Sequence, residues 1–133
     1  MFVERDTETL IDTQLGNLGW IDSPRNPERN VWKQTAKTDK QRLILGRMRP
    51  DYVLYESRTD RAIAVIEAKR PNKDINNALV QGSEYARALE APIVFATDGI
   101  YTKSLHIPTS KSLFRDGEEI DEFIREPLAI QYV

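Results

Sequence analysis

Apolar positions along the chain follow two spacings, and each spacing predicts a different kind of element. From Thr7 to Leu18, apolar side chains recur every three or four residues, which predicts an amphipathic helix. The stretches Asp51–Tyr55 and Arg61–Ala68 are rich in aromatic and β-branched residues, which predicts two strands. Because the polar residues 56–60 form only a short connection between them, we expect a hairpin.

The following stretch predicts a crossover connection. Asp74 is expected to cap a helix that ends at Ala91-Pro92, and the short apolar run Ile93–Ala96 is typical of a buried strand. Strand, helix and strand in this order fit a right-handed parallel connection. A turn at Asp98-Gly99 and an antiparallel strand at Ile100–Ile107 complete an α/β domain with a mixed central sheet flanked by helices.

The remaining segments have weaker patterns of apolar and polar residues. Asn30–Trp32 fits a short strand, whereas Thr35–Leu45 fits either a helix or an irregular basic loop. Gly117–Arg125 is expected to form a short acidic helix that Pro127 ends. The last residues, 128–133, are apolar, and natural chain ends are usually polar, so we expect an excised amino-terminal piece of a longer protein.

The composition limits the class of protein and the kinds of metal site that this chain can form. A chain of 133 residues with 40% hydrophobic and 30% charged residues fits one soluble domain spanning 1–133. It holds no apolar run long enough for a membrane helix, so no membrane partner is expected. The absence of cysteine excludes disulfides and thiolate zinc sites and fits a cytoplasmic location. With His106 as the single histidine, any metal must be held by oxygen, which favours Mg²⁺ or Mn²⁺.

The second strand of the predicted hairpin ends in charged residues. Strand side chains alternate between two faces, so Glu67 and Lys69 are expected on one face with Ile63 and Val65. The other face is expected to hold Ala62, Ala64, Ile66 and Ala68.

Asp51 begins the neighbouring strand and is expected to lie across from Glu67 and Lys69. Two carboxylates, with the carbonyl of Ala68 between them, suit Mg²⁺, which takes hard oxygen ligands and usually one or two protein carboxylates. A nearby ammonium group can stabilise negative charge that develops in a transition state. The pattern therefore predicts a metal-dependent hydrolytic site.

These residues also carry a resemblance. Pro50-Asp51 followed by Glu67-Ala68-Lys69 resembles the PD-(D/E)XK nuclease signature, and Gln81 with Tyr85 resembles the QxxxY extension of one branch. That branch holds RecB-like nucleases and the R (motor) subunits of type I restriction enzymes. The flanking segments 66–71 and 94–99 are similar to those of the R subunit too.

The resemblance implies a PD-(D/E)XK restriction-endonuclease-like core and Mg²⁺-dependent cleavage of double-stranded DNA with little sequence specificity of its own. It implies that Asp51 and Glu67 ligate the metal, that Lys69 is catalytic, and that Gln81 and Tyr85 line the site. A first-helix acid in this family commonly faces the metal. Glu8 is our candidate for it, with Glu4 as the alternative.

The resemblance also implies partners. Translocase domains of the parent chain and separate modification and specificity subunits are expected. ATP is expected only in the parent, because this segment has no GxxxxGK[ST] phosphate loop.

The distribution of charge suggests where DNA would lie. The net charge is −2, yet the charged residues of the segment 25–49 are mostly basic, and this segment leads into the candidate site. Arg49 in this segment, and Arg70 and Lys73 in the turn expected after Lys69, are candidate phosphate contacts. Two alternatives remain open: a nuclease-like module that binds DNA or a partner protein without cutting, and a resolvase or repair nuclease of the same fold.

Overall fold

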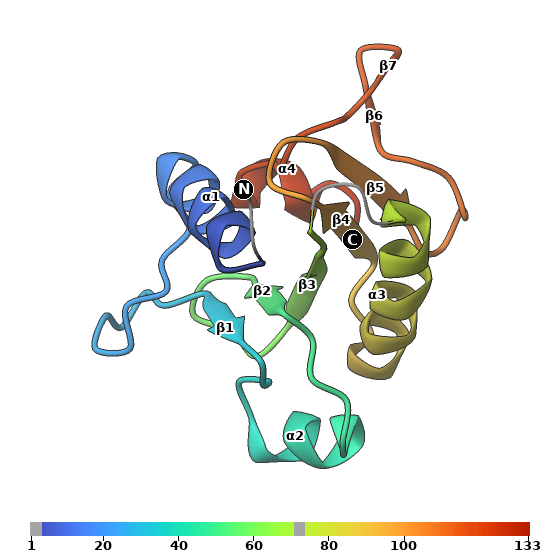
Figure 1. Ribbon diagram of the computed structural model, residues 1–133. Helices are drawn as coiled ribbons and strands as arrows, with labels where there is room; N and C mark the ends of the chain where they lie inside the picture. The colour runs from blue at the N-terminus through green and yellow to red at the C-terminus, as the bar shows by residue number, and fades with distance from the viewer. Residues whose placement is uncertain (1–3, 71–73) are drawn as a thin grey trace.

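The computed structural model describes residues 4–70 and 74–133 (Figure 1). In chain order its elements are α1 (Glu4–Asn17), β1 (Val31–Lys33), α2 (Asp39–Leu45), β2 (Tyr52–Tyr55), β3 (Ala62–Ala68), α3 (Ile75–Leu89), β4 (Ile93–Thr97), β5 (Thr102–His106), β6 (Phe114–Arg115), β7 (Glu118–Glu119) and α4 (Glu126–Ile130).

A mixed sheet forms the centre of the molecule. Its five strands lie in the order β1-β2-β3-β4-β5, and β3 and β4 are parallel while the other neighbours are antiparallel. Helix α3 makes the crossover from β3 to β4 (Figure 1). The expected α/β architecture with a mixed central sheet is confirmed.

Helices cover both faces of this sheet. On one face, Ile11 and Leu15 of α1 pack with Leu54 of β2 and with apolar residues near the end of the chain. On the other face, α3 and the end of α2 pack against Val65 and Val94. Figure 1 shows α1 and α3 on opposite sides of the strands. None of the helices in the described part of the chain is long and apolar enough to span a membrane.

The side chains of β3 alternate between the two faces of the sheet except at one irregularity. The pairing of β2 with β3 skips Ile63, because Leu54 lies opposite Ala64 and Tyr55 lies opposite Ala62. This bulge turns Ile63 toward the α1 face and leaves Ala62 on the α3 face, so the predicted facing of these two residues was wrong. Beyond the bulge the alternation resumes, and Val65 lies on the opposite face from Ala64 and Ile66, as expected.

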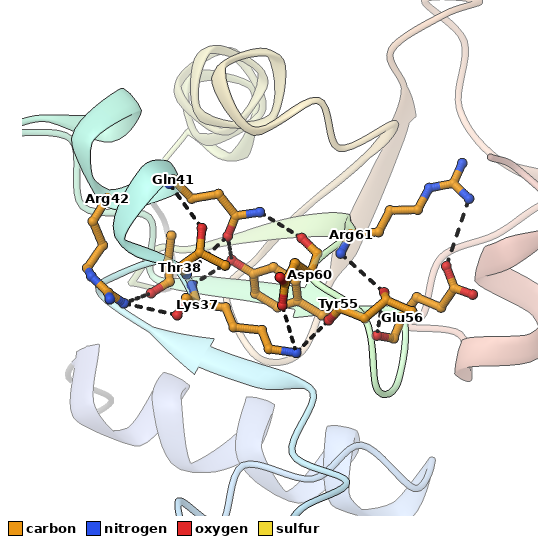
Figure 2. Close-up of polar contacts among 10 residues, drawn as sticks. Lys37, Thr38, Gln41, Arg42, Tyr55, Glu56, Asp60 and Arg61 are labelled. Atoms are coloured by element: carbon orange, nitrogen blue, oxygen red, sulfur yellow. Dashed lines mark hydrogen bonds and ion pairs between the residues drawn. The ribbon is translucent and has the colours of Figure 1, made fainter.

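The basic segment before the candidate site contains a helix, α2, which settles the alternative left open by the sequence. Thr38 caps it, and the side chain of Gln41 completes a capping box. The hydroxyl group of Tyr55 donates to Gln41 Oε1 at 2.8 Å, and Gln41 Nε2 donates to the carbonyl of Asp60 at 2.7 Å. Figure 2 shows Gln41 joining the β2–β3 hairpin in this way, which fixes the path of the chain toward Pro50.

The segment 117–125 is not the acidic helix that we expected. Asp116 and Gly117 both have positive φ, 54° and 81°, and they form the turn of the β6–β7 hairpin. The apolar residues that suggested a helix, Ile120, Phe123 and Ile124, are buried against the α1 face of the sheet. Pro127 does not end a helix but lies in the first turn of α4, where its missing N–H is tolerated.

Candidate functional site

Asp51 and Glu67 come together where β2 begins and β3 ends. The antiparallel register places Tyr52 opposite Ile66, so the residues next to them are close across the two strands. The backbone N–H of Asp51 donates to Glu67 Oε2 at 2.8 Å, and the N–H of Ala68 donates to Asp51 Oδ2 at 2.8 Å. A backbone donor therefore anchors one oxygen of each carboxylate.

The Glu67 carboxyl group lies in an unfavourable electrostatic environment. Its residue is only 3% exposed. Burial, followed by the nearby charge of Asp51, raises the pKa of Glu67 to about 8, and Lys69 only partly opposes this shift. Near neutral pH and without another cation, Glu67 therefore tends to hold a proton.

Helix α3 approaches the sheet closely at this point because it carries a glycine there. A Cβ atom on Gly82 would lie 2.6 Å from Val94 Cγ1 and 3.2 Å from Glu67 Cγ. The sequence pattern did not lead us to predict this role for Gly82. The signal was a glycine in the middle of a helical pattern, which usually has a packing reason.

Gln81 and Tyr85 lie on the same side of α3 and contact each other. Gln81 Nε2 donates to the Tyr85 hydroxyl oxygen at 2.8 Å. Burial is the main cause that raises the pKa of Tyr85, and the negative charges of Glu67 and Asp51 add to it. The Tyr85 hydroxyl group is therefore close enough to sense both carboxylates, and the predicted pair borders the site.

Lys69 is anchored by its backbone at the end of β3. Its N–H donates to the carbonyl of Thr97 at 2.8 Å. The buried hydroxyl group of Thr7 lies 3.4 Å from the carbonyl oxygen of Lys69 and 3.3 Å from that of Asp98. The positive charge of Lys69 lowers the pKa of Glu67, although within residues 4–70 and 74–133 no ion pair joins its ammonium group to Asp51 or Glu67.

Glu8 forms an ion pair with Lys33. Its carboxylate is 3.7 Å from Lys33 Nζ, which Asp12 and Asp22 also approach, at 2.9 and 3.6 Å. Within the described residues, no hydrogen bond or ion pair joins Glu8 to Asp51 or Glu67. The side chain of the alternative acid, Glu4, lies outside the part of the chain that the structure describes.

The candidate phosphate contacts fall into two groups. Arg49 is exposed two residues before Asp51, and its guanidinium donates to the carbonyls of Gly46 and Met48 at 2.7 and 2.9 Å. Arg70 is exposed directly after Lys69. Lys73 lies outside the described residues.

One contact of the site was not predicted. Gln34, which directly follows β1, donates from Nε2 to Asp51 Oδ1 at 2.9 Å. Nothing in the local sequence pattern links residues this far apart.

The oxygen ligands fit a small divalent cation. In residues 4–70 and 74–133, no cluster of three or more His, Cys, Asp or Glu side chains is arranged to hold a metal. The candidate set is therefore the pair Asp51 and Glu67 with the carbonyl of Ala68, and Mg²⁺ needs only one or two protein carboxylates. Burial and the charge of Asp51 raise the pKa of Glu67 despite the opposing charge of Lys69, and a divalent ion held by both carboxylates would counter this shift.

Comparisons with known proteins relate the chain to a family. Residues 24–111 match the family model described as the second domain of the type I restriction enzyme EcoKI endonuclease subunit. Over 49 residues the chain is 49% identical to the type I restriction enzyme EcoAI endonuclease subunit of Escherichia coli, which covers 37% of this chain and 6% of that protein.

A solved structure supports the fold. It is a fragment of a subunit assigned as HsdR, of a type I restriction enzyme from Vibrio vulnificus YJ016. The TM-score is 0.73 at 23% identity, and the match covers 98% of this chain and 25% of that chain. The chain thus spans a small part of the length of both relatives. Because the family model covers most of its residues, the chain belongs to the family of second domains of type I restriction enzyme endonuclease subunits.

Proposed function

We propose that this domain hydrolyses phosphodiester bonds of double-stranded DNA with Mg²⁺, as a PD-(D/E)XK nuclease of the QxxxY branch. The observation that carries the proposal is the pairing of Asp51 with the buried Glu67, whose pKa is raised to about 8. Strongly perturbed acids that lie beside a lysine are typical of functional sites. Membership of an endonuclease-subunit family supports the same reaction class.

The residues of the site have distinct roles in this proposal. Asp51 and Glu67 hold the ion with the carbonyl of Ala68. When bound, the ion supplies Lewis-acid polarisation of the phosphate and a more acidic water. Lys69 compensates negative charge that develops on the phosphate. Tyr85, oriented by Gln81, borders the carboxylates and limits where the phosphate can lie.

Glu8 is proposed to assist from the first helix, where it now contacts Lys33. It is 3.7 Å from Lys33 Nζ and its side chain is 52% exposed, so leaving that ion pair costs little.

DNA binding is proposed to come mainly from outside this domain. Arg49 and Arg70 flank the carboxylates along the chain and can contact phosphates, and Lys73 continues the second group. The net charge of −2 leaves the domain without the overall basic character of a free-standing DNA-binding module. We therefore propose that ATP-driven translocase domains of a parent chain, with modification and specificity subunits, bring DNA to the site in the cytoplasm.

Titration of the chain with Mn²⁺ at several pH values tests the proposal. Because Glu67 must lose its proton to ligate the ion, the affinity for Mn²⁺ should rise with pH and level off near pH 8. Below that point the rise should be about tenfold per pH unit. Calorimetry measures the affinity and the proton released on binding.

Two variants test whether Glu67 is the residue that binds Mn²⁺ in this titration. Glu67→Gln should bind Mn²⁺ weakly at every pH, because it removes one ligand charge and the titrating group. Glu119→Gln changes an exposed acid of β7 and should behave as the unmodified chain does. Affinity that stays constant across the pH range, or a Glu67→Gln variant that binds as tightly as the unmodified chain, would point to a module that does not use this metal site.

A further inference from the structure

Gln34 contacts the candidate site with its backbone and with its side chain. Its N–H lies 3.0 Å from the carbonyl oxygen of Pro50 and 3.2 Å from that of Asp51. Its side-chain Nε2 donates to Asp51 Oδ1 at 2.9 Å. One residue therefore fixes both the entry of the chain into β2 and the Asp51 carboxylate.

The contact completes the support of Asp51. Oδ2 of this carboxylate accepts from the N–H of Ala68 at 2.8 Å, and Oδ1 accepts from Gln34. Each carboxylate oxygen has two acceptor positions, so one donor per oxygen still leaves room for a cation. Donors on both oxygens prevent the carboxylate from rotating.

The backbone conformation of Gln34 argues that its side chain has a purpose. Its φ is +61°, in the left-handed region that favours glycine or asparagine. Glycine would make the same backbone hydrogen bond with less strain. The side chain is otherwise exposed, and its hydrogen bond to Asp51 is the contact that glycine could not supply.

We propose that Gln34 is a positioning residue that orients the Asp51 carboxylate for a divalent cation. This inference rests on the proposed metal-dependent function. Partners that orient a metal ligand typically change metal affinity by about tenfold to a hundredfold. Because Gln34 is exposed, we expect a change near the lower end of that range.

Two substitutions at Gln34 separate positioning from stability. Gln34→Gly removes the donor and relieves the backbone strain, whereas Gln34→Met removes the donor and keeps the size and the strain. Both should raise the dissociation constant for Mn²⁺ about tenfold and shift the NMR resonance of the Asp51 carboxyl carbon in the metal-free chain. The thermal midpoint of metal-free Gln34→Gly should not fall.

Ser110→Gly is the matched control. Ser110 also has a positive φ, 57°, and lies in the turn after β5. This change relieves the same kind of strain and should leave both Mn²⁺ affinity and the Asp51 resonance unchanged.

The outcomes are distinguishable. If both Gln34 variants bind Mn²⁺ as the unmodified chain does, Gln34 has no positioning role, while the proposed metal site stands. If Gln34→Gly loses thermal stability and its Asp51 resonance stays in place, the role is structural and the inference is overturned. If the unmodified chain binds no Mn²⁺, the proposed function fails and the role of Gln34 fails with it.

Discussion

Lys69→Ala and Asp51→Ala should each reduce DNA cleavage by the parent enzyme at least about a hundredfold, because each removes charge that acts on the reacting phosphate or holds the ion. Lys69 is half-buried two residues after Glu67, and its backbone contact with Thr97 does not involve the side chain that alanine would remove. The fold should therefore survive the Lys69 change. Cleavage of supercoiled plasmid by the assembled enzyme measures the effect.

The control for this experiment is a separate activity of the same enzyme. ATP-driven translocation should continue in both variants, because this segment is not proposed to bind ATP. Lys111→Ala removes an exposed lysine side chain directly after the turn that follows β5, and it should leave cleavage unchanged. If both Asp51→Ala and Lys69→Ala still cleave, these residues are not the hydrolytic centre.

Gly82→Ala should destabilise the domain by about 1–3 kcal/mol, the usual range for overpacking a well-filled interior. The new methyl group would lie 2.6 Å from Val94 Cγ1, on a buried strand, and 3.2 Å from Glu67 Cγ. Neither neighbour can move freely, because Val94 is stiff at its Cβ and Glu67 accepts the N–H of Asp51. Urea unfolding measures the change in the free energy of unfolding.

Gly16→Ala provides a comparison within a helix. A Cβ atom on Gly16 would meet no atom within 4 Å, and Gly16 lies inside α1. Alanine there should stabilise the chain by about 0.5–1 kcal/mol, because glycine is a poor helix former. The two glycines should therefore respond with opposite signs. If both substitutions changed the free energy of unfolding by the same amount and in the same direction, close packing of α3 on Glu67 would not restrict the side chain at position 82.

Local patterns were sufficient for much of the fold. Clear apolar patterns mark the two strands around the 56–60 connection, helix α3 and strand β4, and each is present. Pairing Asp51 with Glu67 followed from their positions at adjoining ends of a hairpin. Gln81 and Tyr85 meet because residues four apart share one side of a helix.

The failures share one cause, which is that tertiary contacts decide what local patterns leave open. The bulge at Ile63 changes the facing of side chains without any turn residue to signal it. Ile120 and Phe123 have spacing that suits a helix, but an irregular segment buries them after the Asp116–Gly117 turn. Gln34 reaches Asp51 across a gap in sequence that no periodicity describes.

The contacts of an acid in the first helix are also hard to predict from the sequence. Three acids, Glu8, Asp12 and Asp22, converge on Lys33, so a first-helix acid could face either this lysine or the candidate site. The helix pattern fixes which residues are buried, but it does not fix which neighbouring charge an exposed acid will meet.

Locating Mn²⁺ by its anomalous scattering in crystals of the chain tests the central claim most directly. We predict one strong peak between the carboxylates of Asp51 and Glu67, near the carbonyl oxygen of Ala68, at about 2.0–2.2 Å from its oxygen ligands. A peak only at the acids around Lys33, or no peak at Asp51 and Glu67 at a pH above 8, would contradict the proposal that these two residues hold the catalytic ion.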